Sequence, residues 1–124
     1  MRNVKGEVYE ALQNANITEH LSDGFPTDPV SPGNTIIVYN EVQNSVYEWV
    51  NGHESKSNLE YLIEIWHNES TSSAALAVDA AISALGLRRT MCQDVNGDPS
   101  GWKHKVMRYK GILDLDNNNV LWNN

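Results

Sequence analysis

Apolar residues recur at helical spacing in two segments of the chain. In residues 3–15 they fall on one stripe while charged and amide side chains fill the other positions, which is typical of an amphipathic helix with one buried face. The stripe consists of Val4, Val8, Ala11, Leu12 and Ala15. Residues 74–85 predict a second, alanine-rich helix, which follows a Ser/Thr segment suited to capping its first turn. Gly86 stands where a glycine in the left-handed conformation commonly ends a helix.

The remaining apolar segments follow the pattern of strands. They are residues 35–39, 46–50, 57–67, 87–95 and 105–115, with a short closing strand at 120–122. The first is a continuous β-branched and aromatic run, which predicts a strand covered on both faces. In the third and fifth, apolar and polar residues alternate, which predicts one face turned toward a core. Asn51 and Gly52 form the strongest short-range hairpin signal and join the second strand to the third.

The predicted order of elements is α-β-β-β-α-β-β(-β). Strands in sequence with interspersed helices favour an α+β fold, a mostly antiparallel sheet with two helices packed on it. The length of 124 residues suits a single domain spanning 1–124. Between residues 18 and 34, three prolines exclude a helix or a central strand. Such a long loop indicates either a functional segment or an extended crossover on the surface.

The charge balance disfavours a general DNA-binding role. Sixteen acidic and nine basic residues give a formal net charge of −7, whereas phosphate neutralisation needs a basic surface. The single cysteine, Cys92, excludes an intramolecular disulfide and a cysteine-based zinc site, and we expect it to be a buried small apolar residue in a cytosolic protein. No segment predicts a membrane span or a signal peptide.

Motifs that carry chemistry are not evident in the sequence. No two histidines have the i, i+4 spacing of a helical metal site, and neither a glycine-rich phosphate loop nor a nucleophile elbow occurs. The acidic segment 114–119 is better interpreted as a turn than as a calcium loop. We therefore predict no catalytic residue, no metal site and no cofactor. A small cytosolic enzyme or ligand-binding domain stays an alternative class.

Most of the basic residues gather in one part of the sequence. They include Arg88, Arg89, Lys103, Lys105 and Arg108. One interpretation is a solvated strand face balanced by acidic residues elsewhere. The interpretation we favour is a basic patch that docks an acidic partner surface.

Four segments in this order resemble a known family. They are residues 35–41, residues 61–66, the Ser/Thr segment 70–72 with the alanine-rich helix that ends in residues 84–90, and residues 103–112. Together they are similar to the tail-completion proteins, also called tail terminator or head-to-tail joining proteins, of long-tailed bacteriophages and prophages of Gram-positive bacteria. The resemblance extends over residues 4–122, and its motifs are structural rather than catalytic.

The resemblance implies an α+β protein that assembles without catalysis. Family members form a ring, commonly a hexamer, which caps the tail tube and offers a surface for head–tail joining. The implied partners are further copies of the chain, the tail tube protein and the head connector or head-completion protein, while DNA passes through the ring without specific binding. The implied location is the host cytoplasm during assembly and then the head-proximal end of the tail. A head-completion or connector-adaptor protein is the alternative.

Two segments are candidate contacts in such a ring. The proline-rich loop contains Phe25 and Pro26, and the hairpin contains Trp49, Asn51 and His53. Aromatic side chains carry much interface energy, so Trp49 and Trp66 are candidate anchors. For Trp66, packing in the core is an equal alternative.

Overall fold

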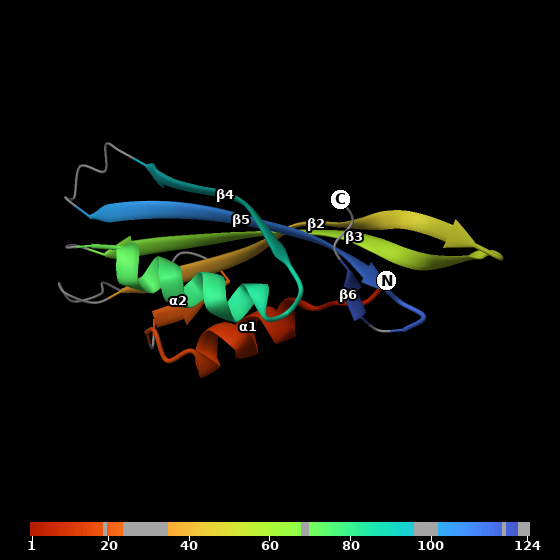
Figure 1. Cartoon of the computed structure of the whole chain (residues 1–124), viewed down its shortest axis with the longest axis horizontal. Coiled ribbons are helices and arrows are strands. Elements are labelled where there is room, and N and C mark those ends of the chain that lie inside the picture. The colour runs from red at the N-terminus through yellow and green to blue at the C-terminus, as the bar shows by residue number, and fades with distance from the viewer. Residues whose placement is uncertain (19, 24–34, 68–69, 96–101, 118, 122–124) are drawn as a thin grey trace.

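The computed structural model describes residues 1–18, 20–23, 35–67, 70–95, 102–117 and 119–121. The elements are α1 (Lys5–Asn14), β1 (His20–Ser22), β2 (Ile36–Val50), β3 (His53–His67), α2 (Ser72–Ser83), β4 (Arg88–Val95), β5 (Lys103–Asp114) and β6 (Asn119–Leu121). A long twisted sheet carries both helices on one face, with the helices in contact (Figure 1). The predicted α+β fold is therefore confirmed.

The sheet is mostly antiparallel, as predicted. Its strand order is β1-β2-β3-β5-β4, and β6 pairs with β5 beyond the end of β4. Only β1 and β2 run parallel among the described strand pairs. The centre of the sheet is the pair β3 and β5, which stays in register from Lys56↔Asp114 to His67↔Lys103.

The core lies between the helices and one face of the sheet. The alternation predicted for β3 and β5 is confirmed, because every second residue from Leu59 to Ile65 and from Met107 to Leu113 is buried on this face. The largest fully buried side chains are Tyr61, Tyr109, Leu12, Ile37, Leu59, Ile63, Ile65, Ile82, Met107, Leu113, Val8 and Val78. The opposite face carries no helix in the described part of the chain, and its side chains range from buried, as at Val38 and Ile112, to exposed, as at Lys110.

Two strand predictions are wrong in their boundaries. The segments 35–39 and 46–50 belong to one strand, β2, which continues through the polar residues between them. Continuous pairing with β3 explains this, because shifts in register at Glu41/Gln43 and Val46/Glu48 absorb the extra residues of β2 without breaking the hairpin. A short strand, β1, also lies within the segment predicted to be irregular. Its three residues pair along the edge of β2.

The ends of α2 combine a confirmed prediction with a corrected one. Gly86 has φ +93°, the left-handed conformation predicted for it. The predicted start at residue 74 is corrected, because α2 begins at Ser72. The Ser/Thr segment contributes to the first turn as predicted: the Thr71 side chain makes no capping hydrogen bond, but the Ser70 Oγ accepts one of 3.3 Å from the backbone amide of Ser72.

Cys92 is exposed, so the prediction of a buried thiol is wrong. It lies in β4, the strand at the end of the sheet order, where all side chains except Met91 are exposed. A strand that pairs along one side and lacks cover on its faces leaves even a small apolar side chain in solvent. None of the described helices is long and apolar enough to cross a membrane.

Candidate functional site

The most prominent surface feature is the far part of the β2–β3 hairpin, residues 42–58, which we call the arm. It extends past the ends of both helices (Figure 1). The cause is a difference in length: each of these strands has 15 residues and spans roughly 50 Å, whereas the 12 residues of α2 span about 18 Å. Helices of this length cannot cover the whole hairpin, so its far part stands outside the helix layer.

The tip of the arm is the predicted tight turn. Asn51 and Gly52 both have positive φ, +53° and +82°. Such a pair matches a two-residue turn whose twist fits the two flanking strands. The turn keeps Val50 and His53 paired directly across the hairpin.

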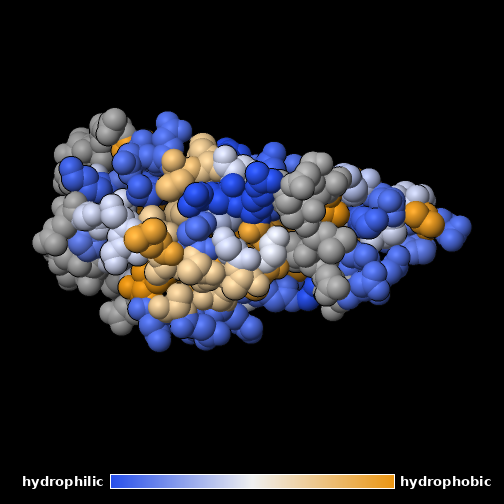
Figure 2. Space-filling model, in the orientation of Figure 1, coloured by the Kyte–Doolittle hydropathy of each residue, from blue (hydrophilic) through white to orange (hydrophobic). Residues whose placement is uncertain are grey.

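Exposed apolar side chains gather on the β2 side of the arm. Trp49 is 62% exposed and Val46 53% exposed, and Tyr47 and Val50 are exposed beside them. Apolar patches also interrupt the hydrophilic surface at the end of the molecule that carries the arm (Figure 2). Large apolar side chains concentrated on one projection are typical of an interaction surface.

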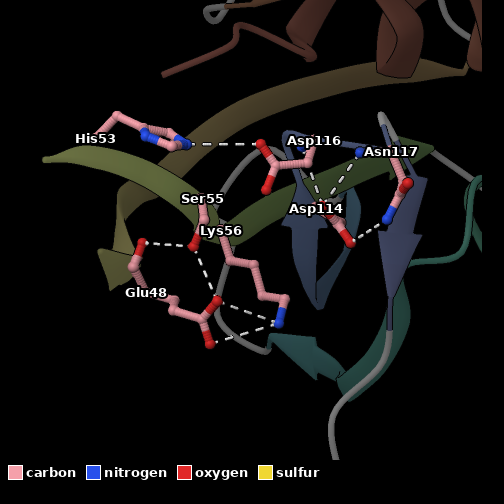
Figure 3. Close-up of polar contacts among 7 residues, drawn as sticks. All are labelled: Glu48, His53, Ser55, Lys56, Asp114, Asp116 and Asn117. Carbon is pink, nitrogen blue, oxygen red and sulfur yellow. Dashed lines mark hydrogen bonds and ion pairs between the residues drawn. The ribbon is translucent and has the colours of Figure 1, made fainter. Parts of the chain in front are cut away.

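Polar contacts stiffen the arm close to its tip (Figure 3). Ser55 Oγ donates to a carboxylate oxygen of Glu48 at 2.9 Å, and Lys56 Nζ lies 3.4 Å from the same oxygen. The turn after β5 contributes two further contacts. The backbone amide of Leu115 donates to the Ser55 carbonyl at 2.9 Å, and Asp116 Oδ1 lies 3.7 Å from His53 Nε2.

That turn is itself ordered by Asp114. One carboxylate oxygen accepts hydrogen bonds from the backbone amides of Asp116 and Asn117, and the other accepts one from the Asn117 side chain. These bonds favour the charged carboxylate and lower the pKa of Asp114 below its usual value. The segment 114–117 is thus the turn predicted from the sequence, and it holds the arm from one side.

A shallow hollow of about 510 Å³ lies along the arm. Its lining includes Val46, Trp49, His53 and Glu54. A second hollow of about 460 Å³ lies between the end of α1 and the start of α2 and is lined largely by alanine, serine and threonine side chains. No group of three or more potential metal ligands occurs among the described residues.

The basic residues singled out in the sequence divide between the two faces of the sheet. Arg89, Lys103 and Lys105 belong to the face that carries the helices, whereas Arg88 and Arg108 belong to the opposite face. Several pair with carboxylates of this chain: Arg89 with Asp79 at 3.4 Å, Lys105 with Asp94 at 3.1 Å, and Arg108 with Glu60 at 2.7 Å.

The other predicted contact residues lie far from the arm or outside the described residues. Phe25 and Pro26 belong to the undescribed segment 24–34. Trp66 is half-buried on the face without helices, where it stacks on His104 with ring centroids 4.0 Å apart. His104 Nε2 also lies 3.2 Å from Glu64. Trp66 is thus partly packed and partly accessible.

Sequence reasoning missed some members of the arm surface. Val46, Tyr47 and Val50 were assigned to a strand but not to a contact surface. Their signal is an apolar run on both faces of one strand, and only the projection of the arm distinguishes this run from a buried strand.

One solved structure places the fold among known proteins. No protein-family model and no curated protein matches the sequence. A chain of the virion of a native gene transfer agent particle matches the structure with a TM-score of 0.52. The match covers 89% of this chain and 96% of that one, at 11% sequence identity. This likeness shows a shared fold along almost the whole of both chains.

Proposed function

We propose that this chain is a structural protein of a phage-like virion. In this proposal it forms a ring at the head-proximal end of the tail tube, ends tube growth and provides a surface for joining the head. The observation that carries the proposal is the fold shared with a chain of a gene transfer agent virion. The sequence resemblance to tail-completion proteins supports the same class.

The arm supports an assembly role rather than catalysis. It presents Trp49 and Val46 on a projection that the turn of residues 114–117 braces. A rigid projection loses little conformational entropy on binding, so its apolar contacts convert efficiently into affinity. We place Trp49, Asn51 and His53 in the contact between neighbouring copies.

The proposed partners follow from the ring. They are further copies of the chain, the tail tube protein and a connector or head-completion protein. DNA passes through the ring without specific binding, which the net charge of −7 favours. Phe25, Pro26, Arg88, Arg89, Lys103, Lys105 and Arg108 remain candidates for these contacts. Assembly takes place in the host cytoplasm, and the finished ring stays in the virion.

Deletion of the gene from its parent phage or prophage tests the role directly. After induction, electron microscopy should show DNA-filled heads beside detached tails of irregular or excessive length. Supplying the intact gene from a plasmid should restore joined particles. Detached tails of normal length would move the role to head–tail joining, whereas intact infectious particles would overturn the assembly role.

A further inference from the structure

The hollow between the end of α1 and the start of α2, which we call the helix-end hollow, lies at the end of the molecule opposite the arm. Its lining includes Thr35 and His67, which adjoin the last paired residues of the β2–β3 hairpin at the end away from the Asn51 turn. Figure 1 shows the same arrangement, with the start of α2 near one end of the long axis and the tip of the arm at the other. Every copy of the chain therefore carries a projection at one end and a hollow at the other.

Small side chains leave the helix-end hollow open. Ala15, Ser73, Ala74 and Ala77 line it from the two helices, and none of them is long enough to fill its volume of about 460 Å³. Ala74 is only 8% exposed, so the floor of the hollow reaches the core. A hollow of this volume lies within the usual range of binding pockets and has room for a bulky side chain.

The tip of the arm offers such a side chain. Trp49 is 62% exposed, and residues 49–52 contain no charged side chain. The described residues that line the hollow likewise include no Asp, Glu, Lys or Arg. Docking of the tip into the hollow therefore buries no carboxylate, ammonium or guanidinium group, so it avoids the cost of desolvating one. An aromatic anchor seated in a pocket is typical of the centre of an interface.

Charges of opposite sign lie beside the two surfaces. The Asp116 side chain is 63% exposed next to the arm tip, and its 3.7 Å contact with His53 Nε2 is too long for a hydrogen bond. Lys103 is paired with His67 across the sheet, so it is an exposed residue beside the helix-end hollow. Its ammonium group has no ion pair or hydrogen bond within the described part of the chain. The charges next to the arm and the hollow are therefore complementary.

We propose that the arm of one copy inserts into the helix-end hollow of the next copy, with Trp49 in the hollow and Asp116 facing Lys103. This contact rests on the proposed function, since it is the joint of the proposed ring. A second copy is the occupant because every chain presents both surfaces and their charges match. Two different surfaces meet in this joint, so it repeats head to tail and can close into a ring.

Cysteine cross-linking tests whether the arm reaches the hollow. In a Cys92→Ser background, we would combine Ser73→Cys at the hollow with either Val46→Cys or Val50→Cys, two exposed positions on the arm. Purified particles and the purified chain would be oxidised mildly and separated without reducing agent. The expected result is a ladder of cross-linked chains up to the size of the ring for at least one combination.

The matched control moves the helix thiol away from the hollow. Ser83→Cys makes the same exchange of serine for cysteine ten residues further along the chain, about 15 Å along α2, and Ser83 does not line the hollow. Combined with the same arm variants, it should leave no ladder.

Exchange of the two charges tests the pairing of Asp116 with Lys103. Lys103→Asp and Asp116→Lys should each lower incorporation into particles about ten-fold, because like charges then face each other across the joint. The double variant restores opposite charges at every joint and should restore incorporation. Urea unfolding of each purified variant would verify that the fold is kept.

Three outcomes would overturn the proposed contact. One is an equal ladder from the Ser83→Cys combinations, which would indicate random collision. Another is the absence of a ladder from both Ser73→Cys combinations in particles that contain the protein, which would leave the proposed function standing. The third is a double charge variant that incorporates no better than the single ones. Absence of the natural chain from purified particles would instead overturn the proposed function, and oxidation of the purified chain would still decide the contact.

Discussion

At the scale of single residues, two buried tyrosine hydroxyls tie the elements together. Tyr61 donates a hydrogen bond of 2.9 Å to Glu41 in the neighbouring strand, and Tyr109 donates one of 2.9 Å to Asp79 in α2. Burial and the carboxylate acceptors raise the pKa of both tyrosines well above the usual value near 10. The neutral hydroxyl is therefore part of the folded state.

The raised pKa values predict a loss of stability in alkali. Above about pH 10 the unfolded chain releases protons from these tyrosines while the folded chain keeps them, so each contributes a fall of roughly 1.4 kcal/mol per pH unit in the free energy of unfolding. The contribution is complete below the unfolded pKa and is lost as the pH rises. Urea unfolding between pH 8 and pH 11 would measure the slope.

Replacing single tyrosines by phenylalanine tests which of them cause the loss of stability in alkali. Tyr109→Phe should flatten the alkaline slope and also lower stability at pH 8 by about 1–3 kcal/mol, because the partly buried hydrogen bond to the charged Asp79 is lost. Tyr9→Phe is the control, since Tyr9 is only partly buried and packs against Tyr39. An unchanged slope in Tyr109→Phe would contradict the assignment.

At the scale of elements, α2 has a packed side and an exposed side that can be compared directly. Ile82 is fully buried against the sheet, whereas Leu76 is exposed. We expect Ile82→Ala to lower the free energy of unfolding by about 2–5 kcal/mol, because it removes buried methyl groups and leaves a cavity. Leu76→Ala should change it by no more than about 0.5 kcal/mol. Urea denaturation measures both, and equal effects would refute this packing.

A substitution in the arm is expected to weaken association without changing the stability of the folded chain. Because Trp49 is exposed in the single chain, Trp49→Ala should leave the free energy of unfolding within about 0.5 kcal/mol. If Trp49 anchors a neighbour, its loss costs about 2 kcal/mol of binding, or roughly thirty-fold in affinity. The measurement is incorporation into particles, with Leu76→Ala as the matched loss of an exposed apolar side chain. Normal incorporation of Trp49→Ala would exclude the anchor.

The sequence predicts those helices, strands and turns that a local pattern of residues determines. The periodicity of α1, the alternation in β3 and β5 and the Asn51 turn are all local signals. The continuity of β2 through its polar residues was not, because the pairing partner β3 imposes it. The same holds for Cys92: an apolar residue within a predicted strand suggests burial, and only the sheet order reveals that β4 lies at an edge. The projection of the arm likewise depends on where the helices end.

At the scale of the whole molecule, the proposed ring is directional, because each copy uses one surface to contact the preceding copy and a different surface to contact the next. A chain damaged on one of these surfaces still binds through the other and then stops growth. An assembly in which identical surfaces meet in pairs lacks this property, because a damaged copy simply fails to bind. The two modes therefore respond differently to mixtures of intact and damaged chains.

This difference predicts a dominant effect of Arg88→Glu. Arg88 is an exposed residue of β4 and a candidate contact in the proposed ring, and the substitution reverses its charge without altering the arm. With equal amounts of variant and natural chain, only about 1 in 64 six-membered rings contains natural chains alone, compared with about 1 in 4 dimers. Expression of the variant from a plasmid during induction should therefore lower the yield of infectious particles by tens of fold, measured by plaque counts. The control is Leu76→Ala at the same expression level, which alters neither β4 nor the arm. If the yield of infectious particles falls by no more than two-fold, a head-to-tail ring that depends on Arg88 is excluded.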